Sequence, residues 1–232
     1  MVSVSMNVGQ IATPRKWLQI MTEVIAGLEI PDTVAVAEAT RLVRDMTSPL
    51  IYHHSRRVYF FGQIHAQRLG ITPDSELLYL AAVFHDTGLT TPFSGTEQRF
   101  EVDGADHGRK FLLEHGFSAA AADTVWTAIA LHTTPGIPDR MGPEIAATYL
   151  GVLTDVVGLG LEELNSDQLS EILAVHPRGD FKKEFLSAYF EGFKHRPETT
   201  NGTVNSDVLE HFVPEHRRTT TVQRMLGSAW PS

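Results

Sequence analysis

The sequence predicts an all-α fold, and three observations support this prediction. Apolar residues recur at helical spacing in successive segments, and alternation typical of strands is nowhere sustained. Helix-starting and helix-ending residues separate these segments. The 232 residues are 42% hydrophobic and 20% charged, as in a globular protein with one large core. We therefore expect a single-domain helical bundle.

The first half of the chain predicts five helices. They are expected at residues 14–21, 34–46, 50–69, 72–86 and 105–115. Between the last two, residues 87–104 are rich in Thr, Pro, Gly and Ser, which predicts a long loop. Long loops beside polar helix ends often shape functional sites.

The second half predicts six more helices. They are expected at residues 119–132, 144–158, 161–175, 181–195, 208–212 and 222–226. An aromatic stripe in the fourth of them predicts a core contact or a contact between copies of the chain, so a homo-oligomer stays open; it consists of Phe181, Phe185, Tyr189, Phe190 and Phe193. We expect a tail with a short helix at residues 1–30, the domain at 31–215 and a second tail at 216–232.

The composition excludes several classes of function. A net charge of −9 with scattered Lys and Arg argues against nucleic-acid and membrane-surface partners. Without cysteine there is no disulfide, thiolate zinc site or Cys nucleophile, so a metal would need His, Asp, Glu or backbone oxygen. The first ten residues lack a signal-peptide pattern and no apolar run is long enough for a membrane span, so we expect a cytoplasmic protein.

The most informative segment is the apolar run Leu77–Phe84, which ends in His85 and Asp86. An ionised carboxylate at the end of a buried helix must be paired or bound to a metal. His54 and Asp155 are two further polar residues in apolar helices, 31 residues before His85 and 69 residues after Asp86. Ligands can converge in this way from three helices of a bundle.

These four residues form a mixed nitrogen and oxygen set that suits zinc, with iron(II) or manganese(II) as alternatives. Simpler interpretations stay open for each of them. His85 and Asp86 could cap a helix end, Asp155 could bind a neighbouring helix terminus, and the adjacent His53 could replace His54.

The order His54, His85-Asp86, Asp155 resembles the HD-domain superfamily of all-α, metal-dependent enzymes. Four segments resemble its cyanamide hydratase branch more closely, namely His54–Tyr59, Phe84–Leu89, Arg99–Ala105 and Ile129–Thr133. The resemblance implies an HD-type fold, His54, His85, Asp86 and Asp155 as metal ligands, and the addition of water to cyanamide at a zinc centre to give urea.

Three further residues are candidates for catalysis. His107 and His132 could transfer protons to and from a small substrate, or they could bind a second metal, as corresponding histidines do in other HD branches. Arg57 lies on the same helix face as His54 and could orient a carboxylate ligand. We expect residues 90–102 to cover the site, with Phe93 and Phe100 as apolar walls.

The leading prediction is a metal-dependent hydro-lyase that hydrates cyanamide or a similar small nitrile. The alternative is an HD-type phosphohydrolase acting on a nucleotide or other phosphate ester. The basic residues between Thr87 and Asp155 are only four, namely Arg99, Arg109, Lys110 and Arg140. This is a small number for a phosphate-binding site. A third interpretation, a non-catalytic metal or ligand-binding protein, is disfavoured by the intact set of four ligands.

Overall fold

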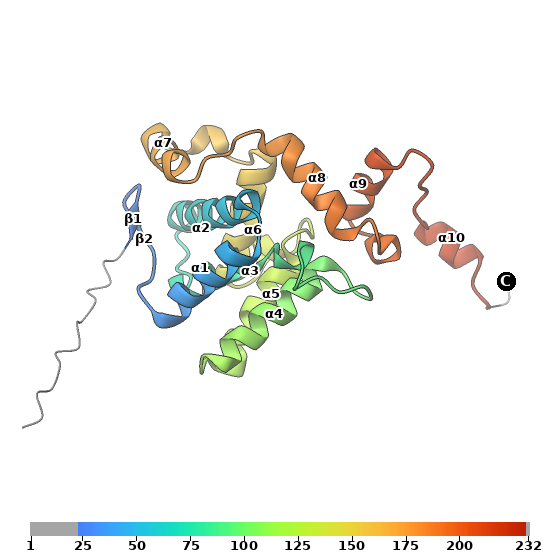
Figure 1. Cartoon of the computed structure of the whole chain (residues 1–232), viewed down its shortest axis with the longest axis horizontal. Coiled ribbons are helices and arrows are strands. Elements are labelled where there is room, and N and C mark those ends of the chain that lie inside the picture. The colour runs from blue at the N-terminus through green and yellow to red at the C-terminus, as the bar shows by residue number, and fades with distance from the viewer. Residues whose placement is uncertain (1–22, 231–232) are drawn as a thin grey trace, which may run out of the picture.

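The computed structural model describes residues 23–230, which form a helical bundle preceded by a short hairpin (Figure 1). The antiparallel hairpin consists of β1 (Val24–Ile25) and β2 (Leu28–Glu29). The α-helices are α1 (Val34–Met46), α2 (Pro49–Leu69), α3 (Ser75–Phe84), α4 (Phe100–Glu114), α5 (Ala119–Leu131), α6 (Pro143–Val157), α7 (Ser166–Val175), α8 (Phe181–Phe193), α9 (Asn205–Phe212) and α10 (Thr221–Leu226). Short 3-10 helices are η1 (Thr87–Leu89), η2 (Pro138–Arg140), η3 (Leu161–Glu163) and η4 (Pro197–Thr200). The all-α prediction is confirmed.

Glycines let the central helices α2 and α6 pack very closely. A Cβ atom at Gly62 of α2 would lie 2.7 Å from the Ala147 carbonyl oxygen. A Cβ atom at Gly151 of α6 would lie 2.2 Å from the Val58 carbonyl oxygen. Both distances are too short for any side chain, so this contact depends on glycine. The close approach brings the middle of α2 next to the middle of α6.

Helix α3 passes through the centre of the main core. Asp74 caps its start by accepting hydrogen bonds from the amides of Glu76 and Leu77. Every side chain from Leu78 to Phe84 is at most 1% exposed, because α3 is covered by neighbouring helices. The polar residues that follow Phe84 therefore emerge inside the protein rather than at its surface.

The long loop predicted at residues 87–104 is shorter than expected. Residues 87–89 form η1, and α4 begins at Phe100, five residues before the predicted start. Phe100 is 1% exposed, and the first turn of α4 carries the acidic residues Glu101 and Asp103, which favour a helix N-terminus. Gly88 and Gly104 touch the neighbouring backbone, so η1 and α4 pack directly on each other.

The structure differs from the predicted elements at two other places. The predicted helix 161–175 is divided into η3 and α7, because the side chain of Asn165 caps a new helix by accepting from the amides of Asp167 and Gln168. The predicted domain start at residue 31 omits the hairpin, whose residues Ile25 and Leu28 are buried in the main core. Two-residue strands are too short to give a periodic pattern. The predicted helix at 14–21 lies outside the described residues.

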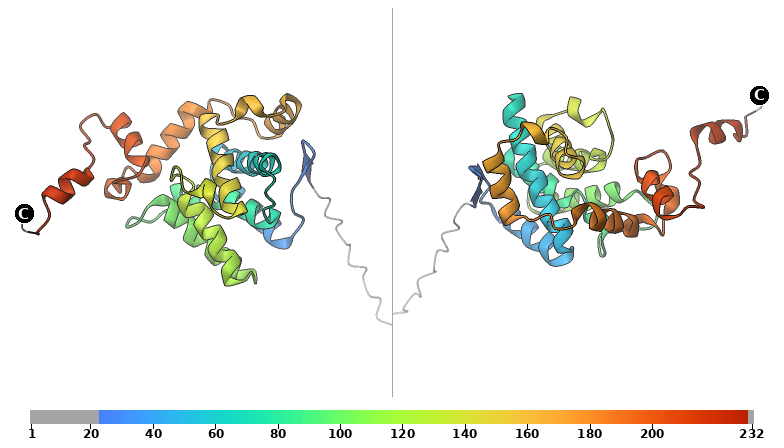
Figure 2. Two further views of the ribbon diagram at one scale, coloured as in Figure 1. Left: turned by 180° about the vertical axis from the view of Figure 1, so that it is seen from behind. Right: turned by 90° about the horizontal axis from the view of Figure 1, so that it is seen from above.

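A second apolar cluster joins α8 and α9 to the body of the bundle. Its buried members are Ile51, Leu89, Phe100, Phe181, Phe185, Phe193 and Leu209. Three residues of the predicted aromatic stripe belong to it, which confirms their role in the core. The helix α10 carries no buried residue and projects from the body in all three views (Figures 1 and 2). Across the described residues, no helix has the length and apolarity needed to cross a membrane.

Candidate metal centre

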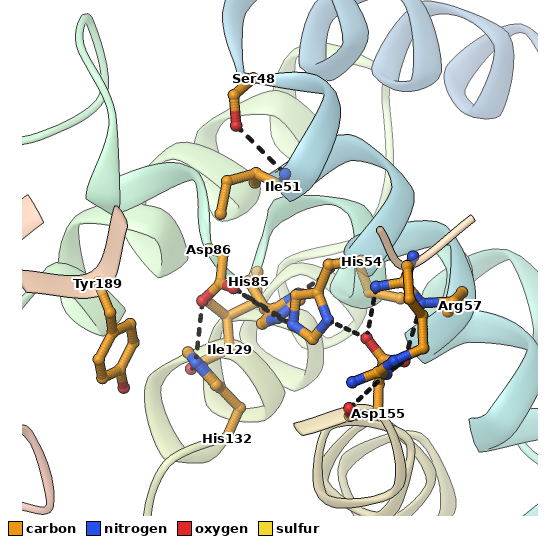
Figure 3. Close-up of polar contacts among 12 residues, drawn as sticks. Ser48, Ile51, His54, Arg57, His85, Asp86, Ile129, His132, Asp155 and Tyr189 are labelled. Atoms are coloured by element: carbon orange, nitrogen blue, oxygen red, sulfur yellow. Dashed lines mark hydrogen bonds and ion pairs between the residues drawn. The ribbon is translucent and has the colours of Figure 1, made fainter. Parts of the chain in front are cut away.

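Three buried residues bring polar atoms together at the centre of the molecule (Figure 3). His54 lies in the second turn of α2, while His85 and Asp86 follow the last residue of α3. Each of the three is at most 1% exposed. One ligand atom from each lies within 4.8 Å of the other two, a separation compatible with a shared metal ion.

The tautomer of each imidazole directs an unprotonated nitrogen toward the same point. His85 Nδ1 lies 2.7 Å from the carbonyl oxygen of Ala82, which can only accept, so Nδ1 carries the proton. His54 Nδ1 donates in the same way to Asp155 Oδ2 at 2.6 Å. The two Nε2 atoms therefore carry lone pairs, and they lie 3.1 Å apart. A neutral imidazole held by its other nitrogen is the usual form of a metal-binding histidine.

The carboxylate of Asp86 completes the candidate site. Its Oδ2 atom lies 3.4 Å from His54 Nε2 and 3.2 Å from His85 Nε2, and it is buried without a hydrogen-bond partner among residues 23–230. Burial raises the pKa of Asp86, but its interactions with the imidazoles of His85, His132 and His54 outweigh burial and hold the pKa well below its usual range. An ionised carboxylate oxygen with no donor, beside two nitrogen lone pairs, fits a divalent cation.

Asp155 lies on the opposite side of the His54 ring from Asp86 (Figure 3). Its carboxylate binds Arg57 in a bidentate manner, with Nε to Oδ1 and Nη2 to Oδ2 both at 2.8 Å. Arg178 also binds Oδ1 and donates to the Asp155 carbonyl oxygen at 2.6 Å. Burial raises the pKa of Asp155, yet hydrogen bonds from His54 and Arg57 lower it below its usual value. In this arrangement Asp155 fixes the His54 tautomer, and its role as a metal ligand stays a prediction.

Asp155 could orient His54 or bind the metal directly, and a substitution distinguishes these two roles. We expect Asp155→Asn to weaken metal affinity about 10- to 100-fold, as loss of a partner that orients a ligand does, while a stoichiometric metal is still bound in excess metal. Titration with zinc against a chelating indicator measures this change. Complete loss of the metal in the variant, equal to that in Asp86→Ala, would instead make Asp155 a direct ligand.

His132 lies beside the cluster and His107 does not. His132 follows α5, donates from Nδ1 to the Ile129 carbonyl oxygen at 2.6 Å, and places Nε2 3.4 Å from Asp86 Oδ1. His107 is half-buried against the ring of Phe93, with ring centroids 4.8 Å apart, away from the cluster. A catalytic role for His107 therefore has no support from its position, and a role for His132 stays a prediction.

His53 faces away from the cluster and contacts His176. Their Nδ1 atoms lie 3.1 Å apart, so one ring donates and the other accepts. Burial, together with the nearby charges of Arg56, His53 and Arg57, lowers the pKa of His176 to about 3. His176 is 3% exposed and stacks on Phe60, which makes it a structural residue.

This pair makes stability dependent on pH. Between pH 6.5 and about 3 the unfolded chain binds a proton at His176 that the folded chain does not, so the free energy of unfolding falls as the pH is lowered through this range. We expect His176→Phe, which keeps an aromatic ring, to make this slope shallower by about 0.5–1 kcal/mol per pH unit. Urea unfolding at pH 6.5 and 5.0 measures the slope. An unchanged slope would contradict a neutral His176 in the folded state.

A cavity of about 290 Å³ lies over the cluster. His54, His85, Asp86, His132 and Thr133 form its polar side. Its other walls come from α6, α8 and the start of α9, with Tyr149, Val152, Phe185, Tyr189, Val204 and Val208 among the lining residues. No Lys or Arg from the described part of the chain lines it.

The predicted covering loop is therefore not the wall of the cavity. Phe93 and Phe100 do not line it, although Phe100 supports His132 with ring centroids 5.6 Å apart. Sequence reasoning missed Tyr189 and Thr133 as site residues. The signal for Tyr189 was its position four residues after Phe185 on one face of α8, but that pattern is equally typical of a core stripe.

The buried bundle and its cluster of two histidines and one aspartate define a metal-binding helical domain. The model of the HD domain family matches residues 51–175, which is more than half of the chain. The chain belongs to the HD-domain family, whose members are generally metal-dependent hydrolases. The match contains His54, His85, Asp86, His132 and Asp155. No curated protein matches the sequence.

Proposed function

We propose that the protein is a metal-dependent hydratase that adds water to cyanamide or a similar small nitrile, giving urea from cyanamide. The observation that carries this proposal is the character of the cavity over the metal cluster. It is small and mostly apolar, and no Lys or Arg lines it in the described residues. Such a cavity suits a small uncharged substrate.

The same observation disfavours a phosphate ester as substrate. Phosphate sites gather Arg and Lys around the anionic oxygens. Three arginines near the cluster are already paired, since Arg57 and Arg178 bind Asp155 while Arg99 binds Glu101. A pocket next to the cavity contains Arg99 and Arg218, but Arg218 binds Asp207 and Glu210.

The residues of the cluster suit the proposed chemistry. When bound to His54, His85 and Asp86, a divalent metal supplies a water of pKa about 7 and a Lewis acid for the nitrile. Asp155 keeps the proton of His54 on Nδ1 and so keeps Nε2 available. His132 Nε2 carries a lone pair at the cavity wall, where it can take a proton from the attacking water and return it to the nitrile nitrogen. Addition forms one C–O bond in place of one C–N π bond and consumes one water. One proton of that water passes to the nitrile nitrogen through His132, and the other moves from oxygen to nitrogen when the isourea tautomerises to urea.

The test combines metal analysis with activity on one preparation of the full chain. We expect about one divalent metal per chain and urea formed from cyanamide, with no phosphate released from nucleotides or p-nitrophenyl phosphate. Phosphate release without urea would replace the proposal by the phosphohydrolase alternative. A fully metal-loaded protein without either activity would reject both.

A further inference from the structure

A buried hydrogen-bond network lies behind the polar side of the cavity and is centred on Glu101. Glu101 is fully buried on α4, and its carboxylate accepts hydrogen bonds from Arg99 Nη2 at 2.7 Å, from Asn205 Nδ2 at 3.0 Å and from Thr133 Oγ1. Burial raises the pKa of Glu101, but its hydrogen bonds and charge interaction with Arg99 lower it below the usual value. The carboxylate is therefore ionised and acts only as an acceptor.

This acceptor fixes the direction of the next hydrogen bond. Because Glu101 can only accept, the amide nitrogen of Asn205 must face it, and Asn205 Oδ1 must face the Tyr189 hydroxyl at 2.9 Å. Tyr189 is therefore the donor in that bond. Burial and the charges of Glu101 and Asp86 keep the pKa of Tyr189 well above its usual value, so the phenol retains its proton.

Two other groups at the cavity also direct their protons away from it. Thr133 donates to Glu101 and accepts from Arg99 Nη2 at 3.2 Å, which leaves one lone pair on its oxygen. His132 donates from Nδ1 to the Ile129 carbonyl oxygen, which leaves a lone pair on Nε2. Tyr189, Thr133 and His132 all line the cavity. The remaining hydrogen-bonding capacity of these three groups consists of acceptors.

We propose that Glu101 and Asn205 are positioning residues that make Tyr189 and Thr133 hydrogen-bond acceptors, so that the cavity selects a small neutral substrate bearing N–H donors. This inference rests on the proposed function and narrows it: an amino-substituted nitrile is preferred to an alkyl nitrile of the same shape. A ligand without N–H groups leaves buried acceptors unpaired, which costs more than the loss of a hydrogen bond in water.

Cyanamide and acetonitrile test this selection, because they differ in an amino or methyl group on the same nitrile. Their intrinsic reactivities cancel when the ratio of their kcat/KM values is compared between protein variants. We expect Tyr189→Phe to lower the cyanamide preference about 5-fold, the value of one hydrogen bond. Asn205→Ala should lower it as well, because the Tyr189 proton is then free to turn toward the cavity. Val208→Ala, which trims an apolar residue of the same cavity, should change both rates by one common factor.

Binding of urea and acetone, which have the same shape, gives a second measurement that needs no turnover. We expect ligand-observed NMR titration of the metal-loaded protein to show tighter binding of urea, and Tyr189→Phe to reduce that preference. If no nitrile is hydrated but urea binds more tightly than acetone and Tyr189→Phe reduces that difference, the proposed function fails. The inference that Tyr189 and Thr133 act as hydrogen-bond acceptors is then retained. Equal affinities for urea and acetone in the wild type, or undetectable binding of both, or preferences unchanged in Tyr189→Phe, overturn the inference.

Discussion

Purified Asp86→Ala is expected to contain no tightly bound metal and to lose at least about 1,000-fold in activity. The substitution removes the only carboxylate among the three clustered ligand atoms and leaves two neutral imidazoles, which hold a divalent cation far less tightly. Metal content per chain, measured after dialysis against a weak chelator, checks the first part. Urea formation from cyanamide checks the second.

Two further variants make the Asp86 result specific. Asp86→Asn keeps the size of the side chain and removes its charge, so it should lose metal in the same way. Asp123→Ala removes an exposed carboxylate of α5 that pairs with Arg109, so metal content and activity should stay at wild-type values. Full occupancy in Asp86→Ala would remove this residue from the ligand set and leave the cluster without a charge to attract a cation.

The local pattern of the sequence was sufficient to predict most helices and to single out the three residues His54, His85 and Asp86 that the fold brings together. Ser48, Asp74 and Ser118 cap helices through side-chain hydrogen bonds because such residues act within one turn of chain. His85 and Asp86 stood out because an apolar run that ends in charged groups must compensate them locally. Both inferences rest on residues that are close together in the chain, so they can be made from the sequence alone.

The rest of the site depends on contacts between distant segments. The orientation of α4 depends on the packing of Gly88 against the Phe100 carbonyl oxygen. In this orientation Glu101 is buried and His107 lies against Phe93. The cavity walls on α8 and α9 come from residues about 100 positions after the His-Asp pair. No spacing rule connects such segments, so the sequence suggested a nearby loop as the cover instead.

Asp155 links the metal cluster to the stability of the bundle. It binds His54 of α2 through one oxygen and Arg57 of α2 through both, so one carboxylate on α6 orients a metal-binding side chain and joins the two central helices. Arg57 is fully buried and also donates to the carbonyl oxygens of His176 and Pro177, at 3.3 and 3.0 Å. The connection between α7 and α8 is therefore held by the same guanidinium.

Arg57→Ala is expected to lower the free energy of unfolding by about 3–5 kcal/mol, because it leaves the Asp155 carboxylate buried without its main partner. Arg178→Ala is the matched control. It removes the second guanidinium on the same carboxylate, but that side chain is 29% exposed and water can replace it, so a loss of about 1 kcal/mol is expected. Urea unfolding of the metal-free protein measures both without a contribution from the metal.

A double substitution separates the cost of an unpaired charge from the value of the ion pair. Arg57→Leu with Asp155→Leu removes both charges of this buried pair, so the double variant should be more stable than Arg57→Leu alone. Its affinity for zinc should nevertheless stay below that of the wild type, because His54 Nδ1 has lost its acceptor. Equal losses of unfolding free energy in Arg57→Ala and Arg178→Ala would show that Arg57 is not the main partner of Asp155. Wild-type zinc affinity in the double variant would show that the orientation of His54 is set by packing against Phe181 and Phe185 instead.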